Sequence, residues 1–235
     1  MKKRDVIVAC DFKDGETTLK FLEIFPNNEK PFVKIGMELF YSEGPDIVRE
    51  IRRRNHSVFL DLKLHDIPNT VMSAMHIISG LDVQITNIHA STTQMMKAAL
   101  EGLNNEERKN KTLLIAVTQL TSTSRESLKN ELLIDQTMED TIRQYAKRAY
   151  DAGLAGVVCS PLETKLVKEA CSDSFITVNP GVRYTTVENE DQSRVTSPKE
   201  AWELGCDYIV VGRPITRAED PLQAYRRVVR DFSKE

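Results

Sequence analysis

The chain has 235 residues, of which 40% are hydrophobic and 29% charged, and its formal net charge is −3. This length and composition suit one large α/β domain or two small ones, and they exclude a mini-protein held together by disulfides or metal. The mixed charge indicates neither nucleic acid nor a membrane surface as a partner. The apolar run Val6 to Cys10 is too short for a signal peptide, and no stretch approaches the roughly 20 apolar residues of a membrane span.

Four cysteines occur in the chain, and none forms a C-x-x-C or C-x-x-H pair. Three of them lie in or beside apolar runs. We therefore expect reduced, mostly buried thiols in a cytoplasmic protein, rather than disulfides or metal ligands. The four are Cys10, Cys159, Cys171 and Cys206.

Eight short runs rich in β-branched residues are expected to form strands. They are continuously apolar rather than alternating, which is typical of parallel strands covered on both faces. In chain order they are Val6–Asp11, Phe32–Gly36, Val58–Leu64, Ile85–Ala90, Leu113–Leu120, Gly156–Ser160, Phe175–Gly181 and Tyr208–Gly212.

Segments with helical spacing of apolar residues separate these runs. Pro68, a residue favoured at helix starts, precedes one of them, and Gly153 and Gly156 are expected to cap another. The segments are Thr18–Phe25, Asp46–Arg54, Thr70–Ile78, Thr92–Leu103, Met138–Ala152, Leu162–Ala170, Pro198–Leu204 and Pro221–Phe232. The gap from Thr121 to Ala155 leaves room for an extended loop.

Eight strands, each followed by a helix, predict a single (β/α)₈ TIM barrel of class α/β that occupies residues 1–235. No linker or break in composition indicates a second domain. A doubly wound open sheet is the alternative, because a count of strands does not prove that the sheet closes.

The active site of such a barrel lies at the carboxyl ends of its strands, where this chain carries unusual charge. Asp61 and Lys63 are two residues apart in one predicted strand, so both should point into the barrel mouth. A structural ion pair is the alternative. Because two charges facing a core are costly unless paired, the pattern favours function.

Lys34 stands inside another predicted apolar strand. Burial lowers the pKa of a lysine unless an acid lies beside it, and Asp11 and Asp61 on the neighbouring strands could supply that acid. A lysine that extends its charged end into solvent is the alternative.

Two turns that combine glycine with arginine end strands seven and eight, at Asn179–Arg183 and at Gly212–Arg213. Barrels often bind phosphate in these two loops, and arginine can bind phosphate oxygens in a bidentate manner. Together the turns predict a phosphate clamp. The spacing of His65, His76 and His89 matches no ligand motif, so we expect no metal site.

The run from Leu60 to Thr70, LDLKLHDIPNT, resembles almost letter for letter the signature of the orotidine 5′-phosphate decarboxylase family, in its shorter bacterial branch. The resemblance covers the whole chain in order. It includes the segments at 8–11, 33–36, 117–122, 159–163, 179–183, 191–195 and 211–216.

The resemblance implies decarboxylation of orotidine 5′-monophosphate to uridine 5′-monophosphate in pyrimidine biosynthesis, with no cofactor and no metal. It implies that Lys34, Asp61, Lys63 and Asp66 form a charged catalytic tetrad, in which Lys63 protonates C6 of the ring. Asp66 would reach into the site of the other subunit of a homodimer. The implied substrate contacts are Asp11 and Lys34 with the ribose, Asp61 at the reacting carbon and Thr121 with the pyrimidine. Four residues would bind the phosphate, namely Arg183, Gln192, Gly212 and Arg213. Ile67 and Thr70 are also implied to bind the substrate.

Three departures from the family pattern occur, at Cys10, at Ser91-Thr92-Thr93 and at Asn179. None falls on a residue with an implied catalytic role.

Two other functions compete with decarboxylation of the nucleotide. A metal-dependent sugar-phosphate decarboxylase shares the barrel and the D-x-K-x-x-D string, but it carries a glutamate metal ligand where this chain has Lys34, and a lysine would repel magnesium. A non-catalytic phosphate-binding barrel would lack a catalytic residue, and none is missing.

Overall fold

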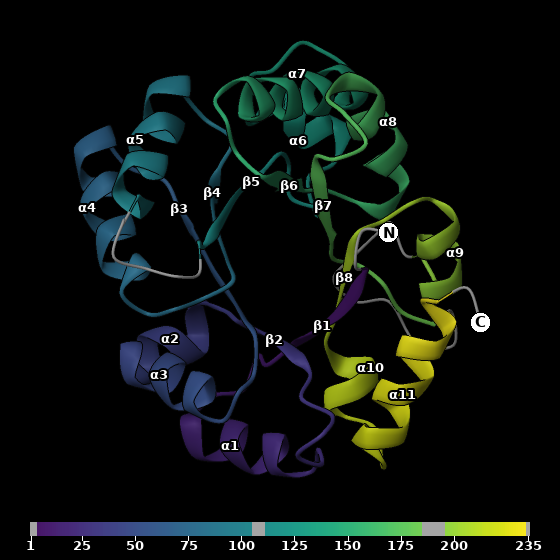
Figure 1. Cartoon of the computed structure of the whole chain (residues 1–235). Helices are drawn as coiled ribbons and strands as arrows, with labels where there is room; N and C mark the ends of the chain where they lie inside the picture. The colour runs from purple at the N-terminus through teal and green to yellow at the C-terminus, as the bar shows by residue number, and fades with distance from the viewer. Residues whose placement is uncertain (1–3, 105–110, 185–195, 234–235) are drawn as a thin grey trace.

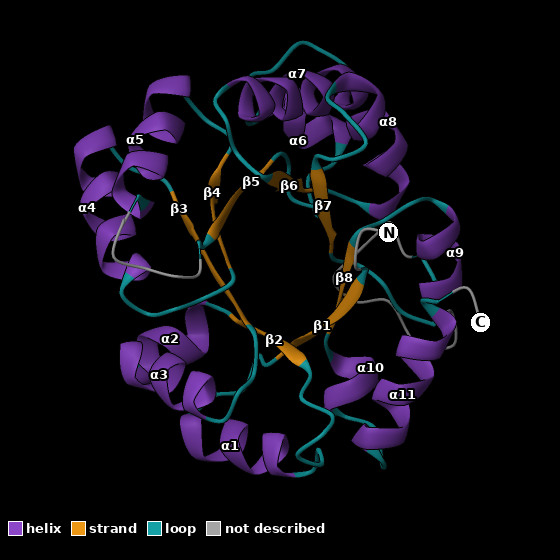
Figure 2. Ribbon diagram, in the orientation of Figure 1, coloured by secondary structure: helices purple, strands orange, loops and turns teal. Residues whose placement is uncertain are grey.

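Eight parallel strands close into a barrel in the order β1-β2-β3-β4-β5-β6-β7-β8. The structure is a computed structural model that describes residues 4–104, 111–184 and 196–233. Figures 1 and 2 show the ring of strands with helices around it. The predicted barrel is thus confirmed, and the open sheet is excluded because β8 pairs with β1. The strands are β1 (Asp5–Ala9), β2 (Phe32–Ile35), β3 (Val58–Leu64), β4 (Ile85–His89), β5 (Leu113–Val117), β6 (Gly156–Val158), β7 (Ile176–Asn179) and β8 (Tyr208–Val211).

The helices follow the predicted segments closely, with three additions that the sequence analysis missed. These are α2 (Met37–Glu43), which buries only Leu39, α6 (Arg125–Asn130), which buries only Leu128, and α10 (Arg213–Thr216), which buries only Ile215. Such short helices bury too few residues to show helical periodicity. The others are α1 (Gly15–Glu23), α3 (Pro45–Arg53), α4 (Pro68–Ser79), α5 (Thr93–Leu103), α7 (Met138–Asp151), η1 (Pro161–Glu163), α8 (Thr164–Ala170), α9 (Pro198–Glu203) and α11 (Pro221–Asp231). None of the described helices is both long and apolar enough to span a membrane.

Two apolar cores hold the barrel together. The inner core fills the space within the strands with side chains such as Ile7, Phe59 and Val178. The outer core packs the other face of the strands, including Val8 and Leu60, against the helices. Because successive side chains of a strand point to opposite faces, both faces of each strand must be apolar. This explains the continuous apolar runs in the sequence.

The cysteines contribute to these cores as free thiols. Cys10, Cys159 and Cys206 are buried, and Cys171 is half-buried. Burial raises the pKa of the Cys159 thiol well above its ordinary value, so this thiol stays protonated and is a poor nucleophile. The expectation of mostly buried cysteines is confirmed.

Gly156 allows β6 and β7 to approach each other closely. A Cβ atom added there would lie 2.2 Å from the carbonyl oxygen of Ile176. The expectation that Gly156 caps the preceding helix is therefore wrong, because the residue lies within β6. Gly153, at φ +92° just after α7, does occupy the predicted helix end.

The Gly156→Ala variant should lower the free energy of unfolding by about 3 kcal/mol, because backbone atoms on both strands would have to move. Denaturant unfolding at neutral pH measures the change. Gly80→Ala is the matched control, since Gly80 is exposed and has helical backbone angles that alanine adopts freely. A Gly156→Ala protein as stable as the control would contradict the steric argument.

Candidate active site

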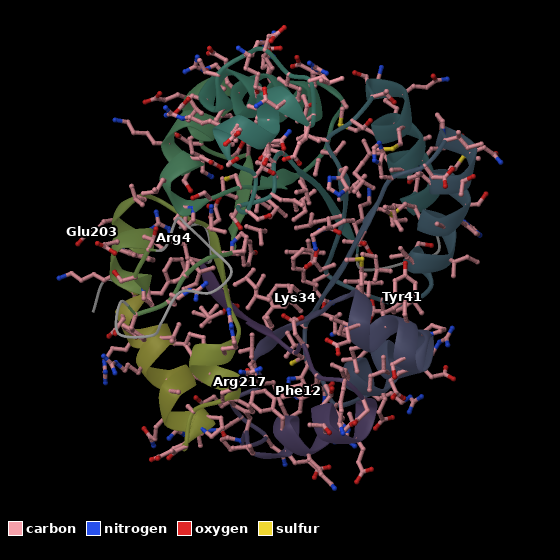
Figure 3. All side chains as sticks on the ribbon, turned by 180° about the vertical axis from the view of Figure 1, so that it is seen from behind. Arg4, Phe12, Lys34, Tyr41, Glu203 and Arg217 are labelled. Atoms are coloured by element: carbon pink, nitrogen blue, oxygen red, sulfur yellow. The ribbon has the colours of Figure 1, made fainter. Side chains whose placement is uncertain are left out.

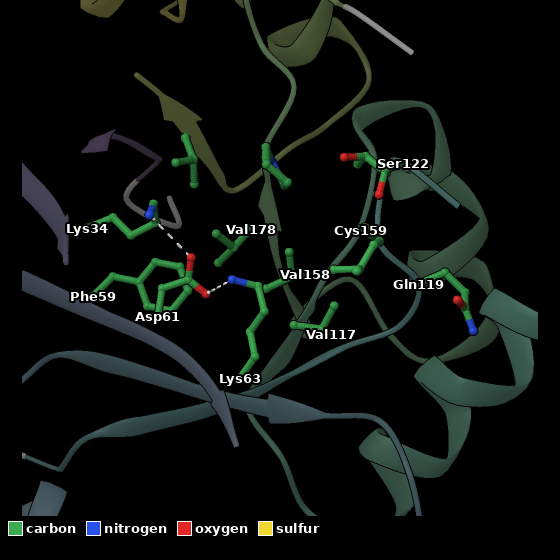
Figure 4. A pocket seen from close by; sticks show the side chains of 14 residues that line it. Lys34, Phe59, Asp61, Lys63, Val117, Gln119, Ser122, Val158, Cys159 and Val178 are labelled. Carbon is green, nitrogen blue, oxygen red and sulfur yellow. Dashed lines mark hydrogen bonds and ion pairs between the residues drawn. The ribbon is translucent and has the colours of Figure 1, made fainter. Parts of the chain in front are cut away.

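An alternating series of charges lies at the carboxyl ends of the first three strands. Asp11 follows β1, Lys34 lies in β2, and Asp61 and Lys63 lie in β3. The Lys34 ammonium is 2.7 Å from Asp11 Oδ1 and 3.4 Å from Asp61 Oδ2, and the Lys63 ammonium is 2.6 Å from Asp61 Oδ1. Figure 3 shows Lys34 inside the ring of strands, and Figure 4 shows Asp61 between the two lysines.

The environment keeps Lys34 and Asp61 charged although both side chains are buried. Burial by itself lowers the pKa of Lys34, but the Asp61 and Asp11 carboxylates outweigh it and raise the pKa above the ordinary 10.5. Burial likewise raises the pKa of Asp61, but the charges of Lys34 and Lys63, with hydrogen bonds from Lys63 and Asn87, bring it below 3.8. The sequence expectation that neighbouring acids offset the burial of Lys34 is confirmed.

The lowered pKa of Asp61 makes its contribution to stability depend on pH. Asp61→Asn leaves Lys34 and Lys63 without their shared carboxylate, and the free energy of unfolding should fall by about 3 kcal/mol at pH 7. A carboxyl whose pKa is lower in the folded state stabilises the protein above its unfolded pKa, and this stabilisation is lost as the pH falls through the folded value. The difference between wild type and Asp61→Asn should therefore be full above pH 3.8 and shrink below it.

Denaturant unfolding of both proteins between pH 7 and pH 3 measures this difference. A difference that stays constant over the whole range would show that the ionised carboxylate is not its source.

A break in the β3–β4 pairing places Lys63. The register shifts between Leu60 and Leu64, and Lys63 has a left-handed backbone with φ +51°. The Lys63 backbone N–H donates to Asn87 Oδ1 at 2.8 Å, and Asn87 Nδ2 donates to Asp61 Oδ1 at 2.7 Å. Asp61 and Lys63 do meet in the barrel mouth as predicted. The simple alternation of a regular strand, however, is not what brings Lys63 there.

A cavity of about 240 Å³ opens beside these charges. Its apolar wall includes Val117, Val158 and Val178, and Thr121 lines it as well. Figure 4 shows these valines facing the charged groups. A flat, mostly apolar ring would fit such a wall, with the charges at one edge.

A second cavity of about 690 Å³ lies beside the first, and Lys34, Pro180 and Val210 line both. Asp11, Arg183, Gly212 and Arg213 line it too, so the two predicted glycine-arginine turns do meet around one space. Arg183 is largely buried, and Gly212 precedes the short helix α10. Two arginines and exposed backbone beside a cavity can bind a phosphate group.

Three of the predicted site residues do not reach these cavities within one chain. Asp66 is exposed, and its carboxylate accepts a hydrogen bond from the Ile67 backbone. Among the ion pairs of the described residues, none joins Asp66 to Lys63. Ile67 is 65% exposed, and Thr70 is exposed in the first turn of α4. Gln192, the remaining candidate for phosphate binding, lies outside the described residues.

The three departures from the family pattern play structural parts. Cys10 is buried in the outer core. Thr92 is the N-cap of α5, where its hydroxyl accepts a hydrogen bond from Met95 N. Asn179 is fully buried, and its Nδ2 donates to the Cys159 carbonyl at 3.0 Å and to Thr164 Oγ1 at 3.1 Å. Asn179 therefore links β7 to β6 and α8 and does not line the second cavity.

The histidines do not gather into a ligand set. His76 lies within α4, and the rings of His65 and His89 are 5.7 Å apart at the rim. Burial and the nearby His65 and Lys63 lower the pKa of His89. Over the ranges that the structure describes, no group of three or more His, Cys, Asp and Glu side chains is placed to hold a metal ion.

Two site residues escaped the sequence analysis. Asn87 lies within the predicted apolar strand Ile85–Ala90, and a polar residue at the centre of such a run is itself a signal. Gly36 follows β2, and a Cβ atom there would lie 3.0 Å from both Asp11 Oδ1 and Lys34 Nζ. No local pattern marks Gly36, because the contact comes from side chains on two strands.

Comparison with known proteins identifies the family of this chain. The sequence pattern of the "Orotidine 5'-phosphate decarboxylase / HUMPS family" matches residues 4–228. The chain belongs to this family. An orotidine 5′-phosphate decarboxylase from Bacillus cytotoxicus is 51% identical over 228 residues, which is 96% of this chain and 95% of that protein. One from Bacillus cereus strain AH187 has the same identity and coverage.

Solved structures show the same relationship for the whole fold. The crystal structure of an orotidine 5′-phosphate decarboxylase from Lactobacillus acidophilus superposes with a TM-score of 0.88 and 39% identity, and covers 98% of this chain and 100% of its own. A conserved protein from Geobacillus kaustophilus superposes with a TM-score of 0.85 and 42% identity, covering 97% and 100%. The family's barrel is therefore present here from end to end.

Proposed function

We propose that this chain is a carboxy-lyase that converts orotidine 5′-monophosphate to uridine 5′-monophosphate, a step of pyrimidine biosynthesis. Family membership and 51% identity to an orotidine 5′-phosphate decarboxylase support the reaction class. The observation that carries the proposal is the series Asp11–Lys34–Asp61–Lys63 at the junction of an apolar cavity and an arginine-lined one.

The two cavities accommodate the two ends of such a nucleotide. In the proposed arrangement the pyrimidine lies in the smaller cavity beside Thr121, and the phosphate lies between Arg183 and Arg213. The ribose then lies between them, where Asp11 and Lys34 can bind its hydroxyl groups. Gln192 is proposed to bridge the phosphate and the base.

The proposed reaction needs no cofactor. Breaking the bond between C6 and the carboxylate releases carbon dioxide and leaves the electron pair on C6, in the plane of the ring. Fixed charge can supply much of the stabilisation that enzymes provide, about 8–23 kcal/mol. The Lys63 ammonium stabilises this carbanion and then donates a proton to C6. Asp61, 2.6 Å from that ammonium, holds it in place.

We further propose a homodimer in which Asp66 completes the site of the other subunit. The exposed carboxylate of Asp66 lies beside Ile67, a large apolar side chain that is 65% exposed. A second subunit could cover both, and Thr70 with them.

The free thiols suit the cytoplasm, where cysteines remain reduced, and we propose that location for the enzyme.

The test is the loss of absorbance when purified protein acts on orotidine 5′-monophosphate. Full activity in the presence of a chelator separates this reaction from a metal-dependent sugar-phosphate decarboxylation. The position of the Lys34 ammonium, between two carboxylates that could otherwise bind a cation, favours the metal-free reaction. A protein that binds the nucleotide without decarboxylating it would instead be a phosphate-binding barrel.

Arg213→Ala should weaken the binding of uridine 5′-monophosphate by about 100-fold, since hydrogen bonds to charged groups each contribute about 1.5–3 kcal/mol. Binding of uridine, which lacks the phosphate, should change less than threefold. Isothermal titration of both ligands with both proteins measures the contrast. Equal losses for the two ligands would remove Arg213 from the phosphate site.

A further inference from the structure

Strand β3 contains two more residues than its partner at the site. Between Leu60 and Leu64 it advances four residues, whereas β4 advances only two, from Thr86 to Ile88. Asn87 is therefore the one β4 residue within the irregular stretch that contains Asp61 and Lys63. Such bulges re-aim side chains beside active sites.

The backbone of Lys63 is held in a conformation that a lysine rarely adopts. Its φ of +51° lies in the left-handed region, which persists in a non-glycine residue only where neighbouring groups enforce it. Relaxation of this one residue toward an extended backbone would swing its ammonium away from Asp61. Some group must therefore hold the backbone at Lys63.

The side chain of Asn87 meets both members of the pair and is fully buried. Its Oδ1 accepts the Lys63 backbone N–H at 2.8 Å, and its Nδ2 donates to Asp61 Oδ1 at 2.7 Å. Chemistry fixes the orientation of the amide, because a backbone N–H can only donate and a carboxylate can only accept. One amide thus satisfies the free N–H of the bulge and orients the carboxylate.

We propose that Asn87 is a positioning residue that clamps Asp61 and Lys63 in their reacting arrangement. This inference rests on the proposed function. Asn87 touches neither cavity and acts only through the two charged residues. A displacement of about 1 Å in a reacting group can lower a rate about 100-fold, so the clamp matters even though a neutral amide supplies it.

The charge of Asp61 requires a hydrogen-bond donor at the position of Asn87 Nδ2. Lys34 and Lys63 contact this carboxylate. His89 lies near enough for the charges of both Lys63 and Asp61 to influence its pKa. The hydrogen bond from Asn87 Nδ2 is among the interactions that offset the effect of burial and lower the pKa of Asp61. An oxygen in place of Nδ2 would oppose the carboxylate instead.

The first test compares Asn87→Ala with Thr86→Val. Thr86 is the neighbouring β4 residue, is equally buried, and donates a hydrogen bond to the Leu60 carbonyl of β3 at 3.1 Å. Both variants therefore lose a buried bond between the same two strands, but only one touches the charged pair. Asn87→Ala should lower kcat about 100-fold with less than a threefold change in the Kd of uridine 5′-monophosphate, and Thr86→Val should leave both nearly unchanged.

The inference is overturned if kcat of Asn87→Ala stays within threefold of kcat of Thr86→Val. It is also overturned if kcat and ligand affinity fall together, because that result indicates a general collapse of the site. Absence of decarboxylation in the wild type itself would overturn the proposed function instead, so the two failures are distinguishable.

Asn87→Asp provides a second test that preserves shape, in case the alanine variant does not fold. It keeps the acceptor for Lys63 N–H but places a second carboxylate against Asp61, and two such groups cannot both ionise at this distance. The acid limb of the kcat/KM profile should move to higher pH by at least about one unit. An unshifted profile with kcat close to that of the wild type would contradict the proposal that Asn87 positions Asp61 and Lys63.

Discussion

Lys63→Ala is expected to lose at least about 10⁴-fold in kcat, because the variant lacks both the proton donor and the positive charge facing the carbanion. Binding of uridine 5′-monophosphate should change only a few-fold, since the phosphate is bound elsewhere, in the cavity lined by Arg183 and Arg213. The measurements are steady-state kinetics on orotidine 5′-monophosphate and titration of the product.

The fold of the Lys63→Ala protein should survive, because the Lys63 side chain is 24% exposed at the barrel mouth. Lys20→Ala is the matched control. Lys20 also lies 2.6 Å from a carboxylate, that of Glu16, but on the exposed surface of α1, and its removal should leave kcat unchanged. Normal turnover by pure Lys63→Ala protein would remove Lys63 from the chemistry.

Mixing two inactive variants should restore activity if the proposed dimer shares its sites. Asp66→Ala and Lys63→Ala should each be nearly inactive alone. After subunits exchange, a mixed dimer contains one site that lacks both residues and one that is intact. Random exchange of equal amounts should therefore recover roughly a quarter of wild-type activity.

Asp61→Ala mixed with Lys63→Ala is the control for this experiment. Asp61 and Lys63 come from the same chain and pair within it, so both sites of that mixed dimer stay broken and no activity returns. The competing explanation for Asp66 is that it caps α4 and stabilises the helix by roughly 0.5–2 kcal/mol. The N-cap of α4 is Ile67, and among the residues that the structure describes the Asp66 side chain bonds only to the Ile67 backbone N–H, which disfavours that explanation. Failure to recover activity despite demonstrated exchange would rule out shared sites.

Much of the site could be predicted because its residues carry local signals. Lys34 and Asp61 are charges within apolar strands, and the two glycine-arginine turns end the last two strands. The barrel rule then places the carboxyl ends of parallel strands at one mouth, so charges far apart in the sequence converge. The structure places these residues around adjoining cavities, as that rule predicts.

Other site features depend on pairing between distant segments and have no local signal. The left-handed backbone of Lys63 exists because β3 is out of step with β4, and Asn87, 24 positions further along, fills the gap. Gly36 must be small because Asp11 and Lys34, on different strands, meet above it. The sequence predicts that Asp66 acts in the site of the other subunit. Within one chain Asp66 is exposed just before α4, and its contact across a dimer stays a prediction.

The sequence by itself determined the number of strands, their parallel arrangement and the charges at their ends. Each of these can be predicted from a short segment, because a parallel strand that is buried on both faces is a continuous apolar run. Closure of the sheet required β1 to pair with β8, some 200 residues later, and only the tertiary structure decides such a pairing. The tertiary structure also decided how Asp61 and Lys63 are held. A bulge arises from the mismatch between two strands, and neither strand alone specifies it.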